Sequence, residues 1–119
     1  MLELGKAANV KIAKFVHAQE LAFRIRSRRN KHLGLWVAAQ LELNERALDY
    51  AKTLVAFALS EPDDEALIRR VQEDLSREGV LVPEAAIRFE LERQTTLAMK
   101  KECTLFQPSR SAVSSHAGH

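Results

Sequence analysis

The chain has 119 residues, of which 46% are hydrophobic and 29% charged, and its formal net charge is +2. This length allows one domain with a modest core, and the composition is typical of a globular protein rather than a wholly disordered one. The longest uncharged internal run, residues 33–41, is far shorter than the roughly 20 apolar residues of a membrane-spanning helix, and no signal-peptide pattern opens the chain. We therefore expect a cytoplasmic protein.

The charges are distributed unevenly along the chain. Residues 1–41 carry eight cations and two anions, residues 42–78 carry five cations and ten anions, and the remainder carries five and four. A basic first segment beside an acidic middle segment predicts ion pairs within the protein before it predicts a nucleic-acid partner.

The first predicted elements are an N-terminal arm and a long helix. Residues 1–14 have weak periodicity and small side chains around Gly5, which is typical of a flexible arm that becomes helical from about Ala8. The helix should continue to about Leu41, because no proline interrupts it. Its apolar stripe, which we expect to be buried, contains Phe15, Ala18, Ala22, Ile25, Leu33 and Trp36.

Two residues of this helix need an explanation from packing. Arg29 interrupts the apolar stripe, and an arginine on a buried face needs a charged or hydrogen-bonding partner. Gly34 costs about 1 kcal/mol in a helix interior compared with alanine. We expect another helix to approach closely at Gly34.

A second helix is predicted over residues 45–59. Asn44 is a residue type that commonly caps a helix N-terminus, and we assign it this role. The inward face of the helix follows from helical spacing and contains Leu48, Ala51, Leu54, Val55 and Ala58.

A third helix is predicted over residues 64–77, after the acidic turn of residues 60–65. Pro62 and the carboxylates that follow it suit a helix start, and Gly79 suits its end. The acidic run lacks the spacing of a calcium-binding loop, so we expect capping and attraction to the basic first helix rather than a metal site. The predicted buried face contains Leu67, Ile68, Val71 and Leu75.

A fourth helix is predicted over residues 83–104, after the short apolar link of residues 80–82. Residues 106–119 are rich in Ser, Ala and Gly and should form a disordered tail, on which His116 and His119 are weak metal candidates. The inward residues of the fourth helix are Ile87, Leu91, Ala98 and Met99. The predicted fold is therefore an all-α four-helix bundle over residues 15–105.

Catalytic motifs are missing from the sequence. It contains no phosphate-binding G-x-x-x-x-G-K-[ST] loop, no G-x-G-x-x-G, no H-E-x-x-H and no nucleophile elbow. We therefore expect neither an enzyme nor a bound cofactor or metal.

The most distinctive sequence lies within the basic part of the first helix. The string Arg-Arg-Asn-Lys-x-Leu-Gly-Leu-Trp at positions 28–36 resembles the signature of the zeta subunit family, a bacterial inhibitor of F-type ATP synthase. The similarity continues over residues 15–101. The signature residues, structural or partner-facing, are Arg28, Arg29, Asn30, Lys31, Leu33, Gly34, Leu35 and Trp36.

The resemblance implies a regulatory subunit that binds the F1 head of ATP synthase through its alpha, beta and gamma subunits. In the family, the N-terminal segment folds as a helix inside a catalytic interface and blocks rotation, which makes binding conditional on the partner's state. Adenine-nucleotide binding is also implied, although no phosphate-loop motif supports it here. The expected F1-facing residues are Lys11, Lys14, Phe15, His17 and Glu20.

Two alternatives follow from other features of the sequence. Family members usually begin with an acidic, aromatic-containing segment, whereas this chain begins Leu2-Glu3-Leu4-Gly5. A divergent member that binds F1 or another protein without inhibiting it is therefore one alternative. The other is a helical nucleic-acid binder whose phosphate-contacting cations would be Arg24, Arg26, Arg28, Arg29 and Lys31.

Overall fold

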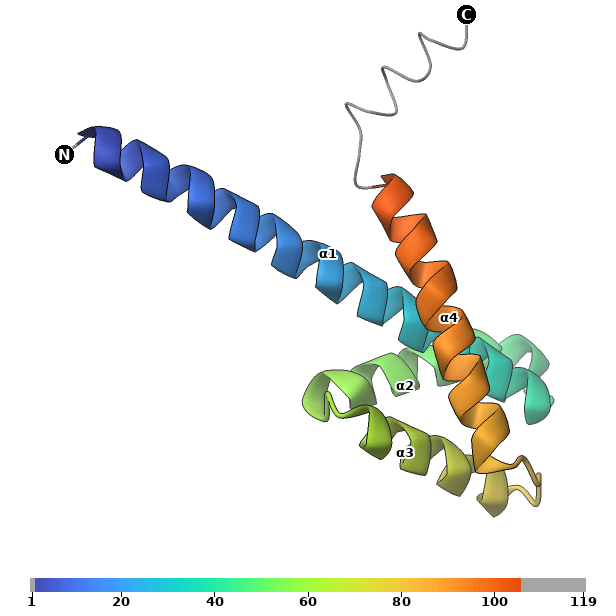
Figure 1. The fold of residues 1–119 in the computed structure, drawn as a ribbon. Helices are drawn as coiled ribbons and strands as arrows, with labels where there is room; N and C mark the ends of the chain where they lie inside the picture. The colour runs from blue at the N-terminus through green and yellow to red at the C-terminus, as the bar shows by residue number, and fades with distance from the viewer. Residues whose placement is uncertain (1, 106–119) are drawn as a thin grey trace, which may run out of the picture.

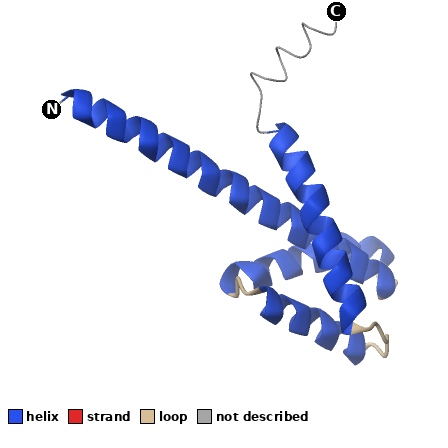
Figure 2. Ribbon diagram, viewed as in Figure 1, coloured by secondary structure: helices blue, strands red, loops and turns tan. Residues whose placement is uncertain are grey.

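The computed structural model describes residues 2–105, with side chains described from residue 11 on. Four α-helices and one 3₁₀ turn make up this part of the chain, which contains no β-strand, and short loops connect them (Figures 1 and 2). The all-α four-helix prediction is confirmed. The predicted tail, with His116 and His119, lies outside the described residues. The elements are α1 (Leu2–Gln40), η1 (Asn44–Arg46), α2 (Ala47–Ser60), α3 (Asp64–Arg77) and α4 (Glu84–Leu105).

Helix α1 is the longest element, and its N-terminal half extends away from the other three helices (Figure 1). Its 39 residues correspond to a length of about 58 Å at 1.5 Å per residue. The helix begins at Leu2, earlier than the predicted start near Ala8, because leucine, lysine and alanine favour a helix enough to offset Gly5. The flexibility of residues 1–14 stays a prediction.

The core is built from aliphatic side chains of all four helices. Trp36, Tyr50 and Phe57 are only partly buried and pack against this core from its edge. The aliphatic composition agrees with the scarcity of aromatic residues in the sequence. The fully buried side chains of largest volume are Leu33, Leu54, Leu67, Leu75, Ile87, Val37 and Val71.

Helices α1 and α2 cross closely at Gly34. A Cβ atom added there would lie 2.7 Å from the Cα atom of Ala51, which is closer than real Cβ contacts. The prediction that Gly34 allows a close helix approach is confirmed. The glycine, with no side chain, lets the backbones of the two helices approach closely.

The turn between α1 and α2 differs from the prediction. Asn44 is not a helix N-cap, because it has a φ of 55° and begins the 3₁₀ turn η1, and Glu42 also has a positive φ of 54°. The Leu43 amide donates to the Ala38 carbonyl at 3.0 Å, which closes α1 in a tight reversal. Asparagine tolerates the left-handed backbone region, and the turn uses this property instead of its capping side chain.

The boundaries of α3 agree with the prediction at both ends. Asp63 caps the helix by accepting a hydrogen bond from the Glu65 amide at 3.2 Å. Gly79 ends the region with a φ of 74°, a backbone conformation that glycine adopts without strain. All four residues predicted for the buried face are buried.

Four residues predicted to face inward are exposed. Phe15 and Ala18 lie on the part of α1 that extends beyond the bundle, so no helix covers them. Leu48 lies in the first turn of α2 and borders a groove described below. Met99 follows the buried Ala98, and the rotation of about 100° per helical residue turns it away from the core.

Candidate partner-binding surface

Helix α1 divides into two parts with different surroundings. We call residues 11–24 the projecting half and residues 25–40 the packed half. Every side chain from residue 11 to residue 20 is exposed, whereas the packed half contains the buried Leu33, Val37 and Ala38. The other helices lie around the C-terminal part of α1, and the N-terminal part extends away from them (Figure 1).

Large apolar side chains lie along one side of the projecting half. Ile12, Val16 and Phe23 are spaced four and seven residues apart, which places them on one face of the helix, and Phe15 lies beside them. Phe15 is 64% exposed and Phe23 is 48% exposed. Several large exposed apolar side chains on one helix face are typical of an interaction site.

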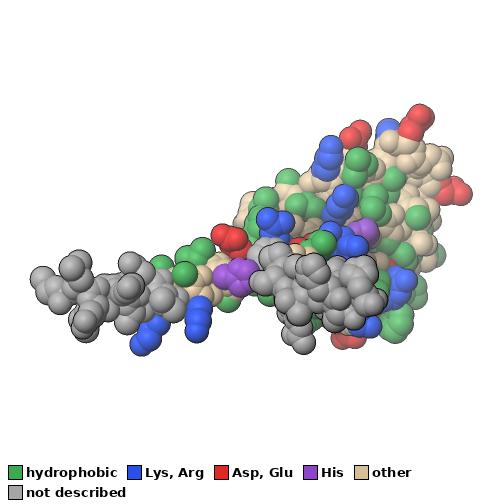
Figure 3. Space-filling model, turned by 90° about the horizontal axis from the view of Figure 1, so that it is seen from above, with side chains coloured by type: hydrophobic (Ala, Val, Ile, Leu, Met, Phe, Trp, Pro, Cys, Tyr) green, Lys and Arg blue, Asp and Glu red, His purple; other side chains and the backbone are tan. Residues whose placement is uncertain are grey.

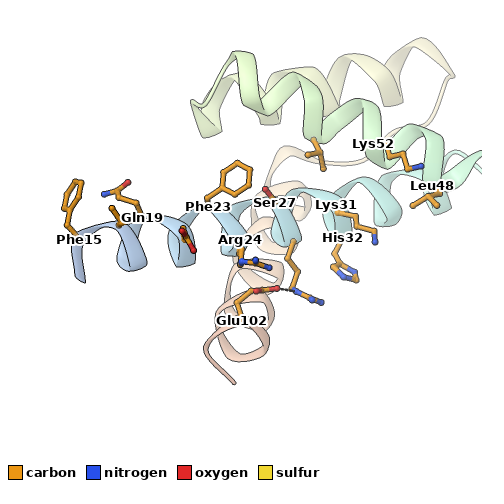
Figure 4. A pocket seen from close by; sticks show the side chains of 14 residues that line it. Phe15, Gln19, Phe23, Arg24, Ser27, Lys31, His32, Leu48, Lys52 and Glu102 are labelled. Atoms are coloured by element: carbon orange, nitrogen blue, oxygen red, sulfur yellow. Dashed lines mark hydrogen bonds and ion pairs between the residues drawn. The ribbon is translucent and has the colours of Figure 1, made fainter. Parts of the chain in front are cut away.

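This apolar face continues into a groove that α1 forms with α2 and α4 (Figure 4). The floor of the groove is α1 from Phe15 to His32, and Leu48, Lys52 and Val55 of α2 form one wall. Glu102, near the end of α4, closes the opposite side. The groove therefore joins the projecting half of α1 to the bundle.

The polar residues of the groove carry mainly positive charge. Arg24, Arg28, Lys31 and Lys52 line it, and in the space-filling view Lys and Arg side chains stand among hydrophobic ones (Figure 3). Glu20 and Glu102 are its two carboxylates, and Glu102 forms an ion pair with Arg28.

His32 also lines the groove, close to its cations. Burial, followed by the charges of Arg28 and Lys31, lowers the pKa of the His32 imidazole below its ordinary value. The groove therefore favours the neutral imidazole.

Arg29 points away from the groove and has a structural role. Its guanidinium donates two hydrogen bonds to Asp64 of α3, at 3.1 Å and 2.8 Å, and its Nε donates to Asn30 Oδ1 at 3.0 Å. The predicted need for a partner is confirmed, and the partner comes from the acidic middle segment. The pair ties α1 to the N-terminus of α3.

The signature residues divide between the core and the groove. Arg29, Asn30, Leu33 and Gly34 are buried, and Leu35 and Trp36 are partly buried. Arg28 and Lys31 line the groove. The signature is thus a single helical segment that holds the bundle together with one face and presents cations with another.

The predicted F1-facing residues all lie on the exposed projecting half. Phe15 and Glu20 also line the groove, whereas Lys11, Lys14 and His17 lie outside its lining. Phe23 was missed, although its aromatic side chain and helical spacing from Ile12 and Val16 signal it. Leu48, Lys52 and Glu102 were missed because only the packing of α2 and α4 brings them to α1.

Three carboxylates of the acidic turn, those of Asp63, Asp64 and Glu65, have protein partners. Besides the Asp63 cap and the Asp64 pair, Glu65 accepts two hydrogen bonds from Arg88 of α4, at 2.8 Å and 2.6 Å. Hydrogen bonding to Arg88 lowers the pKa of the Glu65 carboxyl. In residues 2–105 no group of three or more His, Cys, Asp or Glu side chains is arranged to hold a metal ion.

A second polar cluster connects α2 and α3. The Tyr50 hydroxyl donates to Asp74 at 2.7 Å, and Arg70 and Arg77 pair with the same buried carboxylate. Burial, followed by the hydrogen bond to Asp74, raises the pKa of the Tyr50 hydroxyl. Tyr50 therefore stabilises the bundle rather than the groove.

Fold and surface together define the class of the protein. It is a small helical interaction protein with a long helix that leaves its bundle and exposes apolar side chains. No helix within the described residues is long and apolar enough to cross a membrane.

The chain belongs to a family that agrees with this class. Residues 1–101 match the family model described as ATPase inhibitor subunit zeta, and the chain is a member of that family. Its relatives by family are regulatory inhibitor subunits, and an ATP synthase is the partner that the family implies. No curated protein and no solved structure matches the chain at a significant level.

Proposed function

We propose that the protein binds the F1 head of ATP synthase and inhibits ATP hydrolysis by blocking rotation with its N-terminal segment. Family membership supports an ATP synthase partner. The observation that supports the mechanism is the projecting half of α1, on which Ile12, Phe15 and Val16 are exposed. An inhibitor of this kind needs no catalytic groups, only a higher affinity for one rotational state of its target.

The dimensions of α1 suit insertion into an interface between subunits. Residues 2–24 extend over about 33 Å at 1.5 Å per helical residue, well beyond the other helices. Lys11, Lys14, Phe15, His17 and Glu20 would contact the alpha, beta and gamma subunits. The protein would then be peripheral to the membrane-bound enzyme, on its cytoplasmic side.

The nucleic-acid alternative is less well supported by the contacts of the basic run. Arg28 pairs with Glu102 and Arg29 pairs with Asp64, so at least two of its five cations are engaged inside the protein. A phosphate-binding stripe depends on cations that can neutralise phosphates, and each lost contact weakens binding. We therefore favour the protein partner.

The test is a titration of the ATPase activity of purified F1 with the full chain and with a variant that lacks residues 1–14. The full chain should produce a saturable loss of hydrolysis, and the truncated variant should leave hydrolysis intact while its bundle remains folded by circular dichroism. Full inhibition by the truncated variant would overturn the mechanism.

A charge-reversal pair gives the same test without removing any residues. Lys11→Glu combined with Lys14→Glu should weaken inhibition, whereas Lys100→Glu combined with Lys101→Glu, on the exposed side of α4, should leave it intact. A pull-down with F1 separates the outcomes. Binding without inhibition would identify the divergent member that the altered N-terminal sequence suggests.

A further inference from the structure

The groove between α1, α2 and α4 has the length and shape to hold a helix. Its floor runs from Phe15 to His32, which is about 26 Å along α1, or nearly five helical turns. One wall comes from α2 and the other side from Glu102 of α4, so three elements enclose it (Figure 4). The lining residues on α1 begin at Phe15, after residues 1–14, which are the segment proposed to block rotation.

The floor and the rim of the groove have different chemistry. Phe15, Phe23 and Leu48 supply exposed apolar surface along its length. Lys31 and Lys52 border it from two different helices. Apolar side chains with lysines beside them are complementary to an amphipathic helix whose apolar face is flanked by carboxylates.

Glu102 provides an independent indication that the groove binds a ligand. The residue is only 5% exposed and lines the groove. Its Oε2 atom is paired with Arg28, but its buried Oε1 atom has no hydrogen-bond partner within the described part of the chain. A buried carboxylate oxygen without a donor is costly, and a donor from a bound segment would remove that cost once the Glu102 side chain turns this atom toward the groove.

Charge decides between the possible occupants. The first segment of a second copy is strongly basic, and residues 106–119 of the chain itself contain Arg110 and no Asp or Glu. Neither complements a cationic rim. A nucleic acid would match the cations, but not the apolar side chains of the groove.

We propose that this groove binds an acidic amphipathic helix of the partner, as a second contact distinct from the N-terminal segment. The inference rests on the proposed function in assigning that helix to F1. Two linked contacts would raise the effective concentration of the N-terminal segment at its target, so that a weak segment still inhibits.

The groove can be tested without F1. The probe is a fluorescein-labelled helical peptide of about 18 residues, the length that spans about 26 Å, with a leucine stripe flanked by glutamates. A second peptide keeps the leucines and replaces every glutamate by lysine. The full-length protein should bind the glutamate peptide at least about tenfold more tightly by fluorescence anisotropy, because the lysine peptide places like charges against the rim.

Matched variants assign this binding to the groove. Lys52→Glu should weaken binding of the glutamate peptide about tenfold, whereas Arg69→Glu, an exposed cation of α3 outside the groove, should leave it unchanged. Equal affinity for both peptides, no binding of either, or no effect of Lys52→Glu would overturn the proposal.

Cross-linking then identifies the segment of F1. Phe23 is replaced by p-benzoylphenylalanine in the full chain, and Phe89, an exposed aromatic residue of α4 outside the groove, is replaced in the control. The probe at Phe23 should link to an acidic helical segment of purified F1. A link to a basic segment, to a second copy or to residues 106–119 would overturn the assignment.

The two proposals fail in different ways. If the peptide binds but the protein neither binds nor inhibits F1, the proposed function fails and the groove serves another acidic helix. If the protein inhibits F1 while Lys52→Glu changes neither peptide binding nor inhibition, the groove proposal fails and the proposed function stands.

Discussion

The two halves of α1 are one continuous helix with opposite surroundings. In the packed half, apolar residues such as Leu33 and Val37 are completely buried, and Arg29 is held by Asp64. In the projecting half, apolar residues of similar size, such as Ile12 and Val16, are exposed. The projecting half, residues 11–24, is short enough that it would be only marginally helical in water on its own. Here the packed half provides a nucleated helix from which it can extend.

The comparison shows that an apolar stripe in the sequence identifies one face of a helix, but does not tell which part of the protein, if any, covers that face. The same helical pattern is buried inside the chain in one half and is left exposed in the other half. Stability should therefore depend on the packed half and partner binding on the projecting half. The following predictions separate the two.

The largest expected effect comes from truncating one apolar side chain in each half. Leu33→Ala should lower the free energy of unfolding by about 3 kcal/mol, because it removes a completely buried side chain and leaves a cavity. Phe15→Ala should change it by less than about 0.5 kcal/mol, because Phe15 is already exposed. Urea denaturation measures both changes.

Inhibition of F1 should show the reverse order. Phe15→Ala should weaken it, and Leu33→Ala should leave it largely intact at temperatures where the variant is still folded. A loss of stability in Phe15→Ala comparable to that in Leu33→Ala would mean that the projecting half is packed in the free protein, and the comparison between the halves would fail.

How far the sequence predicts the structure depends on whether the signal is local. The ends of α3 were predicted because Pro62, the carboxylates after it and Gly79 are all local signals. The role of Asn44 was not predicted correctly, because asparagine suits both a helix cap and a left-handed turn. The chain reversal after α1 requires the left-handed turn. Helical spacing placed Phe15 on a stripe, but could not reveal that the bundle stops short of it.

The candidate site shows the same limit. That Arg29 needs a partner follows from its place on an apolar stripe, but the choice of Asp64 depends on how α3 meets α1. The α1 residues of the groove lie within a segment that the sequence already marked as basic and apolar. Its other residues, Leu48, Lys52 and Glu102, are distant in sequence and become neighbours only after folding.

A smaller effect is expected from two arginines of α1 that differ in their contacts. Arg29→Ala should lower the free energy of unfolding by about 1.5 kcal/mol, because it removes charge-assisted hydrogen bonds and leaves Asn30 Oδ1 without its donor. The loss stays moderate because Asp64, with a side chain 49% exposed, is hydrated when Arg29 is absent.

The matched control is Arg26→Ala, an exposed cation of the same helix, which should change stability by less than about 0.5 kcal/mol. Thermal denaturation of both variants measures the difference. Arg29→Lys should recover only part of the lost stability, since a lysine cannot form the bidentate hydrogen bonds that Arg29 donates to Asp64. Equal stability of Arg29→Ala and Arg26→Ala would show that the pair with Asp64 does not hold α1 to α3.

The smallest expected effect concerns pH and His32, at the junction of groove and bundle. Because burial and neighbouring cations lower the pKa of His32 in the folded protein, the unfolded chain binds a proton there more readily. Stability should therefore fall slightly as the pH is lowered from about 7.5 to about 5.5, through the ordinary histidine pKa of about 6.5. Glu65 does not contribute to this fall, because its lowered pKa confines its titration to more acidic solution.

His32→Gln should reduce the fall in melting temperature over this pH range, because the side chain that resists protonation is gone. His17→Gln, on the projecting half, leaves His32 and its surroundings in place and should keep the fall. If His32→Gln and the unmodified protein lose the same stability on acidification, then the folded surroundings of His32 do not lower its pKa enough to affect stability.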